Sequence, residues 1–250
     1  MNKIGNNVFI FLLVFLAPVV NAEAAPENLH DLFNRVLREN VTDGKVNYPG
    51  IKNDARFNAY LTILKQTDPG SFATQAEKLA FWINAYNALA IKGILDGLSP
   101  ASLFGRLRYF KLTKYDVAGK SLTLYDLERN VIIPFNDPRI HFAIVCASAS
   151  CPKLRSEAYV ADRLEEQLDD GAKDFINDAH KNRFDVENKT AELSKIFDWF
   201  KTDFNQHAGS VQHYIKQYLA DPVLREEAAN ETFRISYMKY DWSLNGIPVN

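Results

Sequence analysis

The spacing of apolar positions along the chain is mostly that of α-helices. Apolar residues recur every three or four positions in the segments 27–40, 55–66 and 161–180, and the same period runs through 194–204 and 209–219. This period gathers the apolar side chains on one face of each predicted helix, and that face packs against the rest of the protein. The pattern therefore predicts a protein built mainly from amphipathic helices.

The strongest helix prediction covers residues 75–96. Thr74 and Glu77 have the spacing of a capping box, and Gly97 and Pro100 provide the expected end. The middle of the segment, LAFWINAYNALAIKGIL, is apolar on nearly every side. We therefore expect this helix to be buried over most of its surface.

Two amide side chains, Asn84 and Asn87, interrupt this apolar helix. They stand three positions apart and therefore share one face of the helix. Burying an amide without hydrogen-bond partners costs roughly a few kcal/mol. We expect the two side chains either to hold loops through hydrogen bonds or to face a site, and the first role is favoured because buried amides are usually satisfied.

Predicted strands are fewer and scattered. Asp43-Gly44 places a turn and a short extended piece in 41–48, and 117–122 has the pattern of a hairpin turn. The run 140–145 is typical of a buried strand, and 232–245 begins with a late strand. Strands and helices do not alternate as they do in parallel-sheet proteins. The sequence predicts an α+β fold, a single helix-rich globular domain around a small mixed or antiparallel sheet.

Charge and composition exclude one class of partner. The 250 residues carry a formal net charge of −2, and no basic stripe stands out in the sequence. We therefore expect no nucleic-acid partner. An aromatic content of 12% is typical of a well-packed globule rather than a disordered chain. No pattern in the sequence bears on the oligomeric state.

The N-terminus has the pattern of a secretory signal peptide. Lys3 precedes the apolar run 8–20, and Val20 and Ala22 supply small or apolar residues before a cut after position 22. The run is short for a membrane span. We expect residues 1–22 to be removed and residues 23–250 to form the domain, with no membrane span left after cleavage. Such a protein would be exported, most simply to the periplasm of a Gram-negative bacterium, and would otherwise be secreted.

Five blocks of the sequence carry a family resemblance. In order, they are FWINAYNALAIKGILD, LTLYDLERNVI, DPRIHFAIVCASASCPKLRSEAY, LSKIFDWFKTDF and YDWSLN. Together they resemble the domain-of-unknown-function 547 family of bacteria and plants over about residues 46–245, as an exported bacterial member. The pattern of that family features an acidic residue, a histidine and two cysteines, here Glu128, His141, Cys146 and Cys151. The resemblance implies cysteine-dependent chemistry similar to that of papain or the transglutaminases.

The residue types fit a thiol site. A thiol nucleophile needs a base, and the base needs an orienting acceptor. Glu128 would orient His141, and His141 would take the proton of Cys146 or Cys151. In an extended strand the Cα atoms of His141 and Cys146 would lie ~17 Å apart, with side chains on opposite faces. A direct pair of these two residues therefore requires the strand to end early.

The position of the chain reversal distinguishes the remaining arrangements. A reversal centred on Cys146 would bring Cys151 opposite His141. A reversal centred on Ser148-Ala149 would pair Cys146 with Cys151 instead. The small residues of 147–150 favour this second case, and an oxidising compartment would allow a disulfide there.

A metal site is a third and weaker interpretation. The spacings of His141, Cys146 and Cys151 match no common zinc motif, so we expect no metal and no cofactor.

These observations support two functional hypotheses. The first is an exported cysteine-dependent hydrolase or acyl transferase that acts on an amide or peptide substrate. The alternative is a non-catalytic envelope binding or scaffold module, with Cys146 and Cys151 as a structural or redox-sensitive disulfide. A small molecule or a peptide is the expected partner in the first case. Supporting or substrate-binding roles are predicted for Asn84, Asn87, Arg139 and Asp241.

Overall fold

Residues 28–249 are described by the computed structural model, and helix α4 (Gln75–Leu95) lies at the centre of their larger hydrophobic core. The helix begins at the predicted capping box. The Thr74 hydroxyl accepts a hydrogen bond from the Glu77 backbone, and the Glu77 carboxylate accepts one from the Thr74 backbone. An unbroken run of buried residues follows, from Leu79 to Ile91. Both predictions for this helix, the start and the burial, are confirmed.

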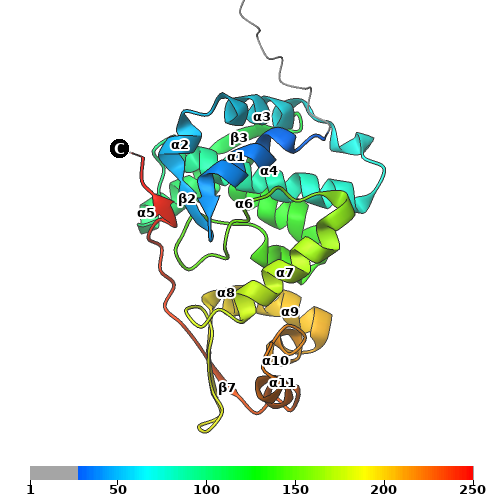
Figure 1. Ribbon diagram of the computed structural model, residues 1–250, viewed down its shortest axis with the longest axis vertical. Helices are drawn as coiled ribbons and strands as arrows, with labels where there is room; N and C mark the ends of the chain where they lie inside the picture. Colours follow the sequence, from blue (N-terminus) through cyan, green and yellow to red (C-terminus); the bar gives the residue numbers. More distant parts are fainter. Residues whose placement is uncertain (1–27, 250) are drawn as a thin grey trace, which may run out of the picture.

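Helices make up most of the described chain (Figure 1). They are α1 (Asp31–Asn40), α2 (Tyr48–Lys52), α3 (Ala55–Gln66), α4, α5 (Leu103–Leu107), α6 (Leu124–Asp126), α7 (Leu164–Ile176), α8 (Lys195–Trp199), α9 (Lys201–Ala208), α10 (Val211–Ile215) and α11 (Pro222–Ala229). Two π-helical segments, η2 (Arg108–Leu112) and η3 (Leu127–Ile132), continue α5 and α6. Short 3₁₀ turns complete the set: Pro69–Ser71, Ile133–Phe135, Pro138–Phe142 and Ala161–Arg163.

The strands form three small sheets among the described residues. The strands are β1 (Val41–Thr42), β2 (Lys45–Asn47), β3 (Lys114–Val117), β4 (Lys120–Thr123), β5 (Arg183–Asp185), β6 (Thr190–Leu193), β7 (Arg234–Tyr237) and β8 (Gly246–Ile247). Two sheets are mixed, with orders β1-β2-β8 and β5-β6-β7, and the third is the antiparallel hairpin β3-β4. The predicted α+β class is confirmed, with the strands divided among these sheets.

Two hydrophobic cores divide the molecule. The larger one is built from α1 to α4 and from residues of the β3-β4 hairpin and η3. The smaller one gathers the C-terminal part of α7 (Ala172–Ile176), β6 and α8 to α10, and helices α8 to α10 lie away from α1 to α4 in Figure 1. The C-terminal chain runs from β7 in the second part to β8 beside β2 in the first (Figure 1). Cys146 packs against both cores, so the cysteine segment lies at their junction.

The predicted strand at 140–145 is wrong. Asp137 caps a 3₁₀ turn over Pro138–Phe142 by accepting a hydrogen bond from the Arg139 backbone, and the chain then continues without regular structure. Proline at the first position favours such a turn. The run is buried on all sides, and its apolar composition therefore resembled that of a core strand. His141 and Cys146 are consequently not on one extended strand, and the expected ~17 Å separation does not apply.

The two asparagines of α4 hold loops, as the sequence favoured. Asn84 pairs with the backbone N–H and C=O of Tyr159, at 2.9 and 2.8 Å. Asn87 accepts from the Val145 N–H at 2.8 Å and donates to the Ala143 C=O at 2.9 Å. Each amide therefore satisfies a piece of buried backbone that lacks a strand partner.

The described helices were also compared with the requirements of a transmembrane helix. Within residues 28–249 no helix combines the length and the apolar character that a bilayer span requires. Residues 1–22, the predicted signal peptide, lie outside the described residues.

The hydrogen bonds of Asn87 give a stability prediction. Replacing Asn87 with Ala leaves the C=O of Ala143 and the N–H of Val145 buried without partners, which should lower the free energy of unfolding by about 3 kcal/mol. The exposed Asn58→Ala variant should change it by less than about 0.5 kcal/mol. Urea unfolding followed by circular dichroism measures both. Equal stabilities for the two variants would show that the hydrogen bonds of Asn87 to Ala143 and Val145 do not stabilise the fold.

Candidate functional site

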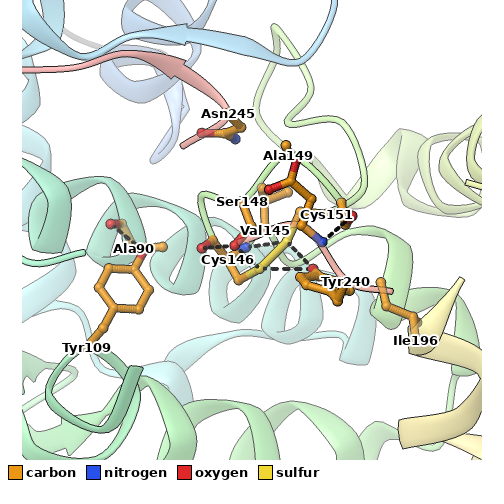
Figure 2. The surroundings of a disulfide bond; sticks show 12 residues. Ala90, Tyr109, Val145, Cys146, Ser148, Ala149, Cys151, Ile196, Tyr240 and Asn245 are labelled. Carbon is orange, nitrogen blue, oxygen red and sulfur yellow. Dashed lines mark hydrogen bonds between the residues drawn. A yellow bond between two sulfur atoms is a disulfide. The ribbon is translucent and has the colours of Figure 1, made fainter. Parts of the chain in front are cut away.

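Cys146 and Cys151 form a disulfide, with their Cα atoms 6.2 Å apart. The Cys151 N–H donates to the Ser148 C=O at 3.0 Å, which closes a turn over Ala149 and Ser150. This is the arrangement predicted for a reversal near Ser148-Ala149. Figure 2 shows the bridge and the residues around it.

The C-terminal segment fixes this turn in place. The Ala149 N–H donates to the Ser243 C=O at 2.7 Å, and the Ser150 N–H donates to the Asp241 C=O at 3.2 Å. In return the Asn245 N–H donates to the Ala147 C=O at 3.1 Å. The turn therefore has partners for its backbone although it belongs to no sheet.

The side chain of Lys181 also fixes the turn. Its ammonium donates to the C=O of Ala149 at 2.9 Å and of Cys151 at 2.6 Å. Burial lowers the pKa of this lysine, and the two carbonyl oxygens partly replace its lost hydration.

Both cysteines line a pocket of about 240 Å³ between the two cores. Its walls come from α4, the two π-helical segments, α8 and the C-terminal chain. The lining residues are Tyr86, Phe110, Lys111, Tyr125, Glu128, Arg129, His141, Ile144, Cys146, Cys151, Pro152, Ile196, Trp199, Phe200, Tyr240 and Trp242. An apolar pocket with a few convergent polar groups is the usual form of a small-molecule or active site.

Tyr240 contacts the bridge directly (Figure 2). Its hydroxyl lies 3.3 Å from the sulfur of Cys146 and 3.3 Å from the sulfur of Cys151, to which it donates. The Cys146 N–H also donates to the Cys151 sulfur, at 2.9 Å. Two donors therefore converge on the sulfur of Cys151. That residue is buried, whereas Cys146 is partly exposed.

His141 is oriented by Asp203. The Nε2 atom of His141 lies 2.8 Å from the Asp203 carboxylate, and the imidazole stacks on Phe200 with 3.8 Å between ring centroids. Burial lowers the pKa of His141, and the hydrogen bond to Asp203 opposes that shift. The same hydrogen bond holds the pKa of Asp203 below its ordinary value.

The other ring nitrogen of His141 is unused within the described part of the chain. Nδ1 is buried and has no hydrogen-bond partner there. If Nε2 donates its proton to Asp203, as a carboxylate requires, Nδ1 carries the lone pair of a neutral imidazole. The pair thus presents a base with a fixed tautomer in the wall of the pocket.

Glu128 does not orient His141. Of the two carboxylates, Asp203 makes the hydrogen bond with the imidazole, whereas Glu128 pairs with Arg129 at 3.5 Å. Burial raises the pKa of Glu128 to about 7, Arg129 lowers it and Asp203 raises it. The predicted role of Glu128 is therefore corrected, although the residue does line the same pocket.

The remaining predicted site residues lie outside the pocket lining. Asn84 and Asn87 hold backbone behind it. Arg139 makes ion pairs with three carboxylates, those of Asp137, Glu165 and Asp169. Asp241 is exposed, and its backbone pairs with Ser150 in the turn. Asp241 thus supports the cysteine segment through its backbone, and Asn87 supports it through its side-chain amide.

Metal ligation was the third interpretation of the cysteines. Across residues 28–249 no group of three or more His, Cys, Asp or Glu side chains is placed to hold a metal ion.

Sequence reasoning did not assign Asp203 or Tyr240 to the site. Asp203 is the second-last residue of the block LSKIFDWFKTDF, and Tyr240 is the first residue of the block YDWSLN. Both lie far from His141 along the chain. Their place in blocks that resemble the family was the one indication in the sequence that they could matter. Only the fold shows that Tyr240 lines the pocket and that Asp203 contacts His141.

Comparison with protein families supports the resemblance. Residues 71–176 match the family model DUF547, which is described as a protein of unknown function. The matched range includes α4, Glu128, His141 and both cysteines, and it excludes Asp203. The match covers residues 71–176 of the expected range 46–245. Neither the curated proteins nor the solved structures contain a match to the chain.

The raised pKa of Glu128 predicts a pH dependence of stability. Its ordinary pKa is 4.5 and its folded pKa is about 7, so the folded state retains a proton that the unfolded state has lost between these values. The contribution of this group is fully present below pH 4.5 and is lost as the pH rises through 7. Glu128→Gln should remove that decline in the free energy of unfolding between pH 5 and pH 8.

Urea unfolding at several pH values measures the effect. Glu187→Gln, which changes an exposed glutamate, should follow the wild-type curve. A Glu128→Gln curve parallel to that of the wild type would contradict the assigned pKa.

Proposed function

We propose that this chain, whose residues 71–176 match the DUF547 family model, is a cysteine-dependent hydrolase or acyl transferase that acts on an amide or peptide. The reaction would take place in the pocket that Cys146, His141 and Tyr240 line.

The hydrogen bond between His141 and Asp203 carries this proposal. It holds the imidazole through Nε2 and leaves Nδ1 as a buried base without a partner, in a pocket that also contains both sulfurs. Nucleophile, base and orienting acceptor are the three parts that thiol catalysis needs. A histidine that served only the core would be expected to use both ring nitrogens in hydrogen bonds.

The proposed reaction begins with the reduced protein. A thiol reductant converts the disulfide into two thiols and is itself oxidised to a disulfide. Nδ1 of His141 then accepts the proton of the Cys146 thiol, and the thiolate adds to the carbonyl carbon of the substrate. The C–N bond breaks, the amine leaves with the proton from His141, and a thioester remains. Attack by water breaks the C–S bond and gives the acid, whereas attack by an amine or hydroxyl gives the transfer product; in both cases the proton of the attacking group passes through His141 to restore the Cys146 thiol.

Accessibility favours Cys146 as the nucleophile. It is partly exposed to the pocket, whereas Cys151 is buried and receives hydrogen bonds from Tyr240 and from the Cys146 backbone. Those donors would stabilise a thiolate on Cys151, which makes Cys151 the better leaving group when a reductant attacks Cys146. Once the bridge is open, the Tyr240 hydroxyl is a nearby donor for the oxyanion that forms on the substrate.

The disulfide itself favours a second candidate function. A non-catalytic binding or scaffold module would need the bridge only to shape the pocket wall. The hydrogen bonds to Asp241, Ser243 and Lys181 already hold the turn, however, and a bridge across so short a loop adds little by chain entropy. We therefore place the catalytic role first.

Export to a periplasm remains part of the proposal. A disulfide persists in oxidising compartments and is rare in the cytosol. The signal-peptide pattern of residues 1–22 supports the same location.

The two cysteines should behave differently in an acylation test. With p-nitrophenyl acetate as the acyl donor, wild-type protein should become acetylated on Cys146 only after treatment with a thiol reductant. Cys151→Ser cannot form the bridge and should react without reductant, whereas Cys146→Ser should give no acetyl-enzyme in either state. Intact-mass spectrometry and peptide mapping measure the adduct. The same variants in urea supply the intrinsic reactivity of an unfolded thiol. A folded, reduced wild type that reacts no faster than its urea-unfolded form would contradict catalysis and favour the binding module.

The His141–Asp203 pair should set the pH at which the thiolate forms. In reduced wild-type protein, iodoacetamide should alkylate Cys146 with an apparent pKa below the ordinary value of about 8.5. His141→Ala should move the profile up to that value and lower the rate at pH 7 on the order of 10²-fold. Asp203→Asn should act in the same direction, because it frees the imidazole tautomer.

Asp198→Asn is the matched control, because Asp198 is a nearby carboxylate that pairs with Lys195 instead. Its profile should equal that of the wild type. Identical profiles for all four proteins would exclude the pair from thiol activation.

A further inference from the structure

The segment 103–112 concentrates exposed apolar side chains at one place on the surface. Four of the eight large apolar residues that are exposed in the described chain lie within it. They are Leu103 at 81%, Phe104 at 66%, Leu107 at 43% and Leu112 at 59% exposure. A soluble protein rarely leaves such a group uncovered without a binding partner.

The same segment is strongly basic. Arg106, Arg108 and Lys111 alternate with the apolar residues, Lys114 follows two positions after the segment, and no acidic residue occurs from position 97 to position 115. The chain as a whole is slightly negative, with a net charge of −2. Positive charge is therefore gathered on this face against the trend of the molecule.

The exposed apolar residues lie on a helical segment that is fixed to the core. Helix α5 runs on into η2, and Tyr109 is fully buried with its hydroxyl donating to the Ala90 C=O of α4 at 2.8 Å. Arg106 donates to the Pro100 C=O and lies over the ring of Trp242 at 4.7 Å. Figure 1 shows α5 at the outer edge of the molecule. The fold thus holds the apolar side chains outward.

We infer that residues 103–112 form a docking surface for a lipid bilayer that carries anionic headgroups. Leucine and phenylalanine mixed with arginine and lysine along one helical segment is the composition of interfacial helices. The apolar side chains enter the boundary between headgroups and acyl chains. Each basic side chain adds an attraction to the negative surface. In a symmetric dimer through this segment the basic side chains of one copy would face those of the other, so the charge favours an anionic lipid surface over a second copy.

The docking surface adjoins the pocket. Phe110 and Lys111 belong to η2 and also line the pocket, and Trp242 connects Arg106 to the pocket wall. A bilayer bound at this segment would therefore lie beside the pocket. The inference goes beyond the proposed function and holds whether or not Cys146 is a nucleophile.

Vesicle binding tests the inference. The purified chain, with its N-terminus read by mass spectrometry, is mixed with vesicles of phosphatidylglycerol and phosphatidylethanolamine or with vesicles of phosphatidylcholine alone. Hydrogen exchange should show protection of residues 101–114 with the anionic vesicles and little with the neutral ones. A Leu103→Glu, Phe104→Glu double variant should lose that protection. Arg108→Ala with Lys111→Ala should weaken binding about tenfold or more at low salt.

Val223→Glu is the matched control, because Val223 is an exposed apolar residue on α11, away from this segment. It should bind vesicles as the wild type does. Hydrogen exchange is the deciding measurement, because it reports on residues 101–114 even when the N-terminal apolar run holds the chain on the vesicle. Unprotected residues 101–114 on anionic vesicles would overturn the inference. Protection that appears without vesicles and falls on dilution would overturn it too, in favour of self-association.

Discussion

The site depends on hydrogen bonds supplied from outside its own segment. Residues 143–151 have no regular secondary structure apart from one isolated bridge between Ser148 and Leu244, so their buried backbone needs partners from elsewhere. Asn87 serves the first residues of the segment, and the C-terminal chain and Lys181 serve the turn between the cysteines. The amide of Asn87 in the apolar helix α4 therefore supplies hydrogen bonds that the backbone of the cysteine segment cannot make within the segment.

Burial then decides the chemistry of the ionisable groups. Glu128 and His141 both lose hydration in the pocket wall, and desolvation favours the neutral form of each. Only His141 has a carboxylate in hydrogen-bond contact, and that contact selects which nitrogen is free. The pocket therefore contains a neutral base and an acid with a pKa of about 7, beside the two sulfurs of the disulfide.

Local patterns predicted much of the helical structure. The segment 55–66 is helical over the predicted range, and the capping box at Thr74 starts α4 where expected. The strand predicted at 140–145 failed because an apolar run that is buried on every side has no period to distinguish strand from turn. The short helices α5 and α11 were not foreseen, since their exposed apolar residues do not make the pattern of a core-facing helix.

The sequence by itself determined the residue types of the site and the family that the chain resembles, because both can be read from short stretches of consecutive residues. It also showed that the pairing of the cysteines depends on where the chain reverses, at Cys146 or at Ser148-Ala149. The tertiary structure decided that question, through backbone partners nearly a hundred positions away. It replaced Glu128 with Asp203 as the acceptor for His141, and it brought Tyr240 to the sulfurs. A hydrogen bond requires its two atoms to lie about 3 Å apart in space. The number of residues between two side chains on different helices or strands does not give the distance between them.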